Sequence, residues 1–362
     1  MCVKILTHNN LRTIFPMKTA IKFSPYELQL RHPFKIATYT RTFTPIMLVT
    51  IQHNGFSGYG EASMPQYLGE TVETASAFLK KIFNSKILER LDITSKTNNI
   101  ADILDEVDIL ESAHSPVKAA LDIALHDLVG KIQEKPVWKI LGSHPEKMPL
   151  TSFTIGIDAP EVIRKKVLEA DKFSVLKIKL GAGNDKEIIN TIRSVTNKPL
   201  YIDANQGWKD KFFAADMVAW LQERGAVMIE QPLPKTDLDG NAYVTEHSTL
   251  PIIADESCQR LRDEINITGA FDGINIKLMK CTGIREAQKM LKLARKKNLK
   301  VMIGCMSETS CGILAAASLA PQCDFVDLDS TFMVTNNPFQ DPILENGRIV
   351  LSNDFGLGLR MK

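Results

Sequence analysis

Short apolar runs recur through the second half of the chain, and a stretch with helical character follows each run. Such runs, bounded by turn residues, predict buried strands. Right-handed repeats of a strand and a helix build a parallel sheet, and eight such units match a closed (β/α) barrel. The eight runs lie at residues 153–157, 175–180, 199–204, 226–231, 251–256, 273–278, 301–306 and 325–330.

An open, doubly wound α/β sheet is the alternative for this pattern. That architecture predicts a glycine-rich phosphate loop after its first strand. The nearest candidate, Gly181-Ala182-Gly183, lacks a third glycine. The pattern therefore favours an α/β barrel over residues 146–335.

The first part of the chain has a different pattern. Apolar and polar positions alternate in places between residues 17 and 60, as at Met47, Val49 and Ile51, which predicts a small antiparallel sheet. Residues 70–142 have helical periodicity. We therefore expect an α+β capping domain over residues 17–145.

Both ends of the chain lie outside these two units. Residues 1–16 do not resemble a signal peptide, because polar residues interrupt their short apolar stretch. We expect a loose extension there, and the sequence leaves open whether Met1 or Met17 is the true start. The tail, residues 336–362, contains a hairpin-like Glu345-Asn346-Gly347 turn and is expected to return to the capping domain.

Composition narrows the function classes. The chain has 362 residues, and 44 Lys and Arg against 42 Asp and Glu leave a formal net charge of only +2. This balance argues against a protein that binds nucleic acid or anionic lipid with its whole surface. No apolar run approaches the roughly 20 residues that span a bilayer. The six cysteines are scattered without a C-x-x-C pair, which favours a reduced, cytoplasmic protein.

Three consecutive strands of the predicted barrel end in acids. In such a barrel the carboxyl ends of the strands converge on one mouth. Asp203, Glu230 and Asp255 occupy the same place in successive units. A single acid there would be explained as a helix cap, but three in register point to a metal site. Carboxylate oxygens favour Mg²⁺, and Mn²⁺ can substitute.

Lysines flank the three acidic strands. Lys177 and Lys179 share one face of their strand, and burying both against the helix layer would be costly, so the polar mouth is the better place. Crowding by Lys177 and the metal should lower the pKa of Lys179 and make it a general base. Lys277 would lie across the mouth. Two bases on opposite sides of a metal-bound carboxylate suit removal of an α-proton and its return to the other face of an enediolate.

At these residues the sequence resembles the enolase superfamily, in its muconate-lactonising subgroup, which uses Lys or His bases with Mg²⁺. The matching motifs are the helix PVKAALDIALHDLVG, the Lys177-Ile178-Lys179 pair, the three acids, Asp255-Glu256-Ser257 and NIKLMKCTG. The resemblance implies a modified (β/α)7β barrel whose capping domain is completed by the C-terminal segment. It also implies a metal held by Asp203, Glu230 and Asp255, with Lys179 and Lys277 as the acid/base pair and Lys177 beside them. Asn205 and Glu256 follow two of the acids and are expected to support the metal ligands.

Two further segments resemble the dipeptide epimerases of this subgroup. One is GCMSETS at 304–310, which contains Cys305 and Met306, and the other is the D-x-D pair of Asp327 and Asp329. In that family the pair is placed to hold the ammonium group of a dipeptide, and charge-assisted hydrogen bonds would select such a cation. The predicted function is a Mg²⁺-dependent epimerase that inverts the Cα of the C-terminal residue of L-Ala-L-Xaa.

Other activities on the same scaffold remain open alternatives. They are o-succinylbenzoate synthase, N-acylamino acid racemase and cycloisomerase. A metal-dependent binding protein without turnover would have no use for two opposed lysines. Cap-bearing barrels often self-associate, so a homo-oligomer is compatible with the sequence.

The residues that set the substrate are expected on two loops of the capping domain, 31–41 and 59–70. Lys35 or Arg41 would bind an acidic side chain, as in L-Ala-L-Glu, while Tyr67 would equally suit a small or hydrophobic one. Such loops vary most for a given fold, so the identity of the epimerised residue stays open.

Overall fold

The structure is a computed structural model that describes residues 19–35 and 40–362. The predictions about residues 1–16 and about a start at Met17 lie outside the described residues. Among the described residues, no helix combines the length and the apolar character needed to cross a bilayer.

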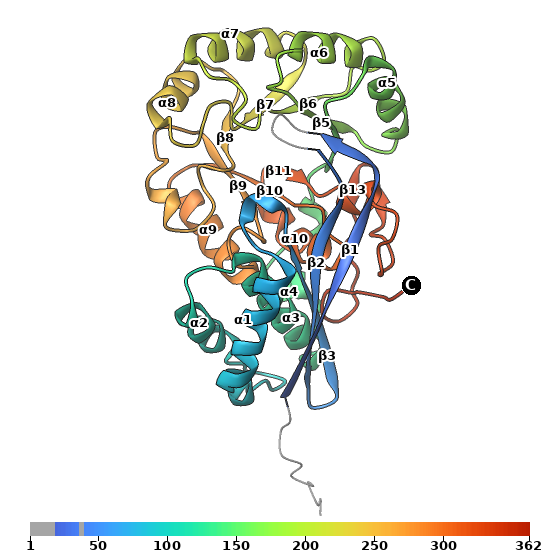
Figure 1. Ribbon diagram of the computed structural model, residues 1–362, viewed down its shortest axis with the longest axis vertical. Helices are drawn as coiled ribbons and strands as arrows, with labels where there is room; N and C mark the ends of the chain where they lie inside the picture. Colours follow the sequence, from blue (N-terminus) through green and yellow to red (C-terminus); the bar gives the residue numbers. More distant parts are fainter. Residues whose placement is uncertain (1–18, 36–39) are drawn as a thin grey trace, which may run out of the picture.

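The capping domain begins with a three-stranded antiparallel sheet, β1-β2-β3. Its strands are β1 (Thr19–Lys35), β2 (Thr40–His53) and β3 (Phe56–Ser63). One face of the sheet buries Met47, Val49 and Ile51 against helices, so the predicted sheet is present. The long β1–β2 hairpin reaches from the cap towards the barrel (Figure 1). The helices are α1 (Val72–Ser85), α2 (Ile100–Leu110), α3 (Ser115–Ile132) and α4 (Val137–Ile140), with 3-10 turns η1 (Gln66–Leu68), η2 (Ile87–Arg90) and η3 (Pro145–Lys147).

Helix α3 lies unusually close to β3. A Cβ atom on Gly60 would come within 1.9 Å of the carbonyl oxygen of Ala120. Only glycine on the strand, facing small residues on the helix, permits this approach. The helix is buried along nearly its whole length, which explains why its side chains are small or apolar.

The barrel contains eight parallel strands in the order β4 to β11. A bridge between Thr151 and Val326 joins the first and last strands, so the sheet closes. The connection between β8 and β9 contains only the short η4 (Asp263–Ile265), where the repeat predicted a helix. The strands are β4 (Ser152–Ile155), β5 (Val175–Lys179), β6 (Leu200–Asp203), β7 (Ala226–Glu230), β8 (Ile252–Ala254), β9 (Gly273–Lys277), β10 (Lys300–Gly304) and β11 (Phe325–Asp327).

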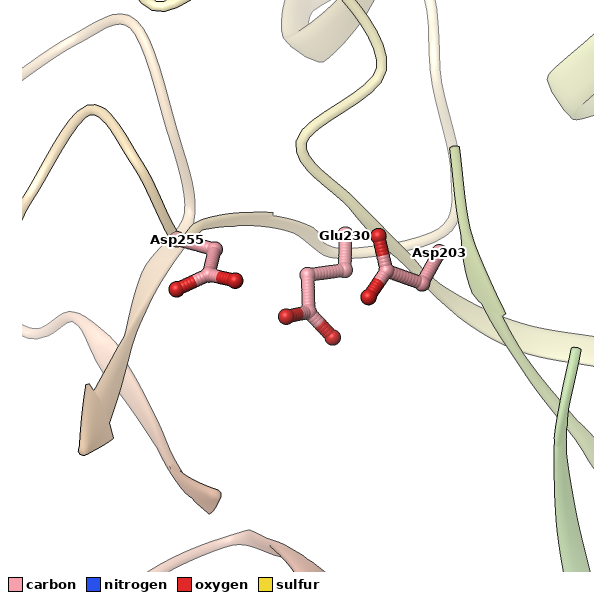
Figure 2. Close-up of side chains that lie close together, drawn as sticks. All are labelled: Asp203, Glu230 and Asp255. Carbon is pink, nitrogen blue, oxygen red and sulfur yellow. The ribbon is translucent and has the colours of Figure 1, made fainter. Parts of the chain in front are cut away.

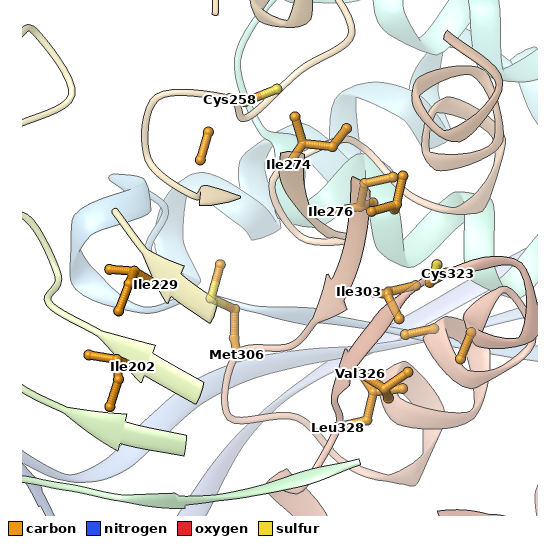
Figure 3. Packing of buried hydrophobic residues seen from close by; sticks show 14 of the residues in the cluster. Ile202, Ile229, Cys258, Ile274, Ile276, Ile303, Met306, Cys323, Val326 and Leu328 are labelled. Carbon is orange, nitrogen blue, oxygen red and sulfur yellow. The ribbon is translucent and has the colours of Figure 1, made fainter. Parts of the chain in front are cut away.

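Helices surround the barrel and bury its outer face. Isoleucines on several barrel strands, such as Ile202, Ile229 and Ile303, point outward into this layer (Figure 3). A separate cluster that includes Tyr201 and Met228 fills the interior of the barrel towards the amino ends of the strands. The charged side chains lie beyond this cluster, at the carboxyl ends of the strands. The outer helices are α5 (Pro160–Glu169), α6 (Asp185–Arg193), α7 (Lys211–Gln222), α8 (Leu238–Glu246), α9 (Ile284–Lys296) and α10 (Ser310–Ala317), with η5 (Ala320–Gln322).

The C-terminal segment returns to the cap. After α11 (Ser330–Met333), the strands β12 (Leu344–Glu345) and β13 (Arg348–Ile349) form the predicted hairpin. Further on, the backbone N–H of Leu357 donates to Asp127 on α3, at 2.8 Å. The other oxygen of Asp127 accepts a bond from the backbone of Tyr59 on β3. One buried carboxylate thus ties the tail, the cap helix and the cap sheet together.

Candidate active site at the mouth of the barrel

A cavity of about 490 Å³ lies at the carboxyl ends of the barrel strands, beneath residues of the cap. The barrel contributes most of its charged wall, and the cap contributes Phe34, Arg41, Gln66 and Tyr67. The predicted site residues that line the cavity are Lys177, Lys179, Lys277, Asp255, Asn205, Glu256, Asp327, Asp329, Arg41, Tyr67, Cys305 and Met306.

Three carboxylates meet beside this cavity. Asp203 and Glu230 end adjacent strands in register, and Asp255 directly follows β8. All three are buried, and each offers one carboxylate oxygen that lies within 4.8 Å of those of the other two. Figure 2 shows the three side chains gathered on the inner side of the strands. Because only oxygen donors are gathered here, the group fits a hard divalent cation such as Mg²⁺.

A lysine lies at each end of this acidic triad. Lys179 donates to Asp203 Oδ2 at 2.6 Å, and Lys277 donates to Asp255 Oδ2 at 2.7 Å. Both ammonium groups border the cavity. The structure therefore brings together the two predicted bases on opposite flanks of the acids.

Lys177 occupies the centre of the charge cluster. Its Nζ lies 2.7 Å from Glu230, 2.8 Å from Asp327 and 3.2 Å from an oxygen of Asp203. Burial alone would lower the pKa of Lys177, but Asp327 and the other two carboxylates outweigh burial and raise it well above its ordinary value. Lys177 therefore stays protonated and acts as a fixed positive charge.

The three acids differ in their tendency to ionise. Burial raises the pKa of each, but Lys277 and Lys280 hold the pKa of Asp255 well below its usual value, and Lys179 and Lys177 lower that of Asp203. Burial and the neighbouring charge of Asp203 raise the pKa of Glu230 to about 7. A cation bound beside Glu230 would favour its ionised form, because a nearby positive charge lowers the pKa of a carboxyl group.

Three residues of the cluster lie outside the predicted site. Lys280 donates to Asp255 Oδ1 at 2.5 Å, and Asn275 donates to Glu230 Oε1 at 2.8 Å. Gln231 Oε1 accepts the backbone N–H of Asp255 at 3.0 Å. Asn275 shares the inward face of β9 with Lys277, so its spacing could have revealed it. Lys280 lies beyond the strand end, where no periodicity marks it.

The D-x-D pair lies on the far side of Lys177 from the triad. Asp327 pairs with Lys177 and accepts a bond from Ser152 Oγ at 2.7 Å. Asp329 Oδ2 accepts the backbone N–H of Thr154 at 2.6 Å. Burial and the charge of Asp327 raise the pKa of Asp329 to about 7. This carboxyl group would be stabilised as an anion by a cation arriving in the cavity.

The two expected supporting residues differ in their contacts. The backbone N–H of Asn205 donates to Asp203 Oδ1 at 2.9 Å, which orients that carboxylate. Among the described residues, Glu256 Oε2 has no hydrogen-bond partner, and the side chain lines the cavity instead. Burial and the charge of Asp255 raise the pKa of Glu256 to about 7. Their supporting roles remain predictions.

The cap closes one wall of the cavity through contacts with the segment after β10. Arg41 donates to Ser307 Oγ at 2.8 Å, and the Tyr67 hydroxyl donates to Met306 Sδ at 2.9 Å. Cys305 borders the cavity beside them. Lys35 ends β1, but its side chain lies outside the described part of the chain. The two loops predicted to set the substrate thus meet the barrel at Met306 and Ser307.

Comparison with known proteins places this geometry in a family. Residues 18–142 match the mandelate racemase / muconate lactonizing enzyme N-terminal domain, and residues 162–362 match the enolase C-terminal domain-like family. The chain belongs to the mandelate racemase and muconate lactonizing enzyme family of the enolase superfamily. This family membership, the capped barrel fold and the racemase or epimerase class of enzyme were all predicted and are confirmed.

Relatives of this family carry more specific names. An L-Ala-D/L-Glu epimerase of Bacteroides thetaiotaomicron is 54% identical over 94% of this chain and 88% of its own length. The structure resembles a dipeptide epimerase of Enterococcus faecalis complexed with Mg and L-Leu-L-Tyr, with a TM-score of 0.86, 32% identity and coverage of 95% and 99% of the two chains. It also resembles a dipeptide epimerase of Cytophaga hutchinsonii complexed with Mg and D-Ala-L-Val, with a TM-score of 0.86, 27% identity and coverage of 96% of each chain. Together with the triad, these Mg complexes confirm the predicted cofactor.

Removal of Lys280 should destabilise the fold. This side chain is 1% exposed and also donates to the backbone oxygens of Asp255 and Asn275. Lys280→Met leaves the buried Asp255 with only one of its two lysine partners, which lowers the free energy of unfolding by about 3 kcal/mol. Urea unfolding without added metal measures this loss. Lys289→Met, at an exposed position of α9, is the matched control and should change stability by less than about 0.5 kcal/mol. Equal stabilities of the two variants would contradict the account of the cluster.

Proposed function

We propose that this protein is a Mg²⁺-dependent dipeptide epimerase that inverts the Cα of the C-terminal residue of L-Ala-L-Xaa. The observation that carries the proposal is the placement of Lys179 and Lys277 on opposite flanks of one acidic triad. A racemising enzyme needs a proton acceptor on one face of the substrate carbon and a proton donor on the other. The names of the relatives support a dipeptide as the substrate.

The proposed metal ligands are Asp203, Glu230 and Asp255. Their chemistry fits Mg²⁺, because all are carboxylates and one oxygen of each lies within 4.8 Å of the others. When bound, Mg²⁺ supplies positive charge that stabilises the negative charge developing on the substrate carboxylate. We assign Lys177, which stays protonated, to the same carboxylate, since its positive charge borders the cavity from the barrel interior.

The two flanking lysines move the proton. We assign Lys179 to one face of the substrate α-carbon and Lys277 to the other. Burial lowers the pKa of Lys277, but Asp255 outweighs it and raises the pKa well above the ordinary value, so Lys277 begins as a proton donor. For one stereoisomer, Lys179 removes the α-proton and Lys277 returns a proton to the opposite face. The roles reverse for the other stereoisomer, because the reaction is reversible.

Asp327 and Asp329 are proposed to hold the ammonium group of the dipeptide. Asp327 is already paired with Lys177, so Asp329 is the carboxyl group that most needs a cation. The free α-amino group of a dipeptide is cationic at neutral pH. An N-acylamino acid racemase or an o-succinylbenzoate synthase acts on substrates without this cation, and the relatives support these alternatives less.

The side chain of the epimerised residue is proposed to meet Arg41. This guanidinium borders the cavity and is positioned by Ser307, and it stacks over the Phe34 ring at 5.4 Å. A fixed cation on the cavity wall favours an acidic side chain, so L-Ala-L-Glu is the preferred substrate of the proposal. We also propose action in the cytoplasm, since a reducing compartment suits the five free thiols of the described residues.

Proton NMR in D₂O with Mg²⁺ tests the function. A panel of L-Ala-L-Xaa dipeptides, with Xaa as Glu, Ala, Thr, Phe, Leu or Lys, is incubated with the purified protein. Loss of the α-proton signal of Xaa and appearance of the diastereomer would support the epimerase. Reaction of an N-acylamino acid or a succinylbenzoate precursor, with no dipeptide exchanged, would favour the alternatives. Dipeptide binding without exchange would indicate a binding protein.

Asp329→Asn should impair turnover of free dipeptides. Loss of a buried carboxylate that pairs with the substrate ammonium costs about 100-fold in kcat/KM. Wild-type protein should likewise fail to turn over N-acetyl-L-Ala-L-Glu, whose amino group carries no charge. Asp239→Asn, at an exposed position of α8, is the control. Full activity of Asp329→Asn on L-Ala-L-Glu would remove the ammonium-binding role.

Arg41→Met should change the choice of substrate. We expect kcat/KM for L-Ala-L-Glu to fall by about 30-fold, as for loss of one charge-assisted hydrogen bond of roughly 2 kcal/mol. The value for L-Ala-L-Leu should stay within about threefold, and Arg41→Lys should recover part of the activity on Glu. An equal loss of kcat/KM for both dipeptides would show that Arg41 shapes the cavity but does not bind the side chain of the epimerised residue.

A further inference from the structure

Two glutamates lie buried together where the cap meets the barrel, outside the proposed catalytic machinery. Glu61 belongs to β3 of the cap and is 0% exposed, and Glu308 follows β10 of the barrel and is 1% exposed. A Cβ atom built on Gly312 would lie 2.5 Å from Glu61 Oε1 and 2.2 Å from Glu308 Oε2. The two carboxyl groups therefore face each other across the space that this glycine leaves open.

Most of the oxygens of this pair are already engaged. Glu61 accepts bonds from the backbone N–H groups of Thr309 and Gly312 and from the Thr309 hydroxyl. Glu308 Oε1 accepts the backbone N–H of Met306 at 2.7 Å. Glu308 Oε2, which faces Glu61, is buried and has no hydrogen-bond partner among the described residues. A proton between this oxygen and Glu61 would satisfy it.

The charges around the pair do not neutralise it. Within residues 19–35 and 40–362, neither glutamate takes part in an ion pair. Lys277 on β9 lowers the pKa of Glu308 through its charge, without a hydrogen bond, and the described thiols that feel the charge of Glu308 are the half-buried Cys305 and the buried Cys311. Asp127 and Lys131 of α3 act on Cys311 with opposite signs. Two like charges buried side by side without a cation cannot both ionise at neutral pH.

We propose that Glu61 and Glu308 share a single proton, and that this carboxyl–carboxylate pair locks the cap onto the segment that forms one wall of the cavity. Glu308 is then a positioning residue: its Oε1 holds Met306, and Met306 and Ser307 meet Tyr67 and Arg41 of the cap. The shared proton does not depend on the reaction, whereas its effect on substrate binding rests on the proposed epimerase function.

The pH dependence follows from the raised pKa values. Burial raises the pKa of Glu61 to about 7, and burial with the neighbouring Glu61 raises that of Glu308 to about 8. A carboxyl whose pKa is higher in the folded state contributes stability that is full below about pH 4.5 and is lost as the pH rises through the folded value. Above about pH 8 the pair carries two negative charges, and the cap should loosen at the cavity wall.

Glu308→Gln tests the shared proton, because the variant can keep the hydrogen bonds of Glu308 but has no carboxyl group to titrate. The amide oxygen can still accept the Met306 N–H, and the amide nitrogen can donate to Glu61 at any pH. Infrared difference spectra of the Mg²⁺-loaded wild type and variant, both with ¹³C-labelled glutamate, should show a protonated carboxyl band near neutral pH that only the wild type has. Absence of that band would overturn the shared proton, whether or not the protein is an epimerase.

KM for L-Ala-L-Glu tests the positioning role. The ratio of the wild-type KM to the Glu308→Gln KM cancels the titration of the substrate amine and of the lysines. This ratio should rise about tenfold between about pH 7 and pH 9, as one proton leaves the pair. Glu308→Ala should raise KM at every pH, whereas the KM of Glu308→Gln should stay near the wild-type value at neutral pH.

Glu264→Gln is the control, because it removes a buried carboxyl of η4 that does not border the cavity. The ratio of the wild-type KM to the Glu264→Gln KM should not change with pH. A flat ratio for Glu308→Gln, or an unchanged KM for Glu308→Ala, would overturn the positioning role.

Discussion

The buried charge cluster at the mouth of the barrel constrains the rest of the structure. Four lysines pair there with four carboxylates in an interior that excludes most water, and Lys177 alone contacts three of the acids. Removing a single partner from such a cluster leaves a charge that the protein cannot solvate. The scaffold must therefore hold every member in place, and the proposed chemistry uses that order, because an organised site stabilises charge without rearrangement during the reaction.

The barrel and the cap contribute different parts of the site. Parallel strands in register place Lys179, Asp203 and Glu230 at the same height, while apolar residues fill the interior below them. The cap contributes no member of the charge cluster among the described residues, but it forms a wall of the cavity through Arg41 and Tyr67. The barrel thus supplies the proposed catalytic groups, and the proposed choice of substrate depends on how the cap packs against the barrel. The pair of Glu61 and Glu308 lies in this contact between cap and barrel.

Much of the site could be predicted from the sequence, because a strand period of two and a repeat of about 25 residues place side chains at predictable points. The three acids and Lys179 follow from that spacing alone. Lys280 could not be found in this way, because it lies on a turn past the end of β9. The missing helix between β8 and β9 and the facing of Glu61 with Glu308 depend on tertiary packing, which no local pattern encodes.

In the proposed reaction, two lysines serve opposite faces of one substrate carbon. Hydrogen–deuterium exchange by Lys179→Ala and Lys277→Ala, each measured with L-Ala-L-Glu and with L-Ala-D-Glu in D₂O and Mg²⁺, tests it most directly. Lys300→Ala, at the exposed opposite end of a barrel strand, is the control. We expect that neither lysine variant epimerises, and that each exchanges the α-proton of only one diastereomer, a different one for each variant. Epimerisation by either variant, or exchange of the same diastereomer by both, would contradict it.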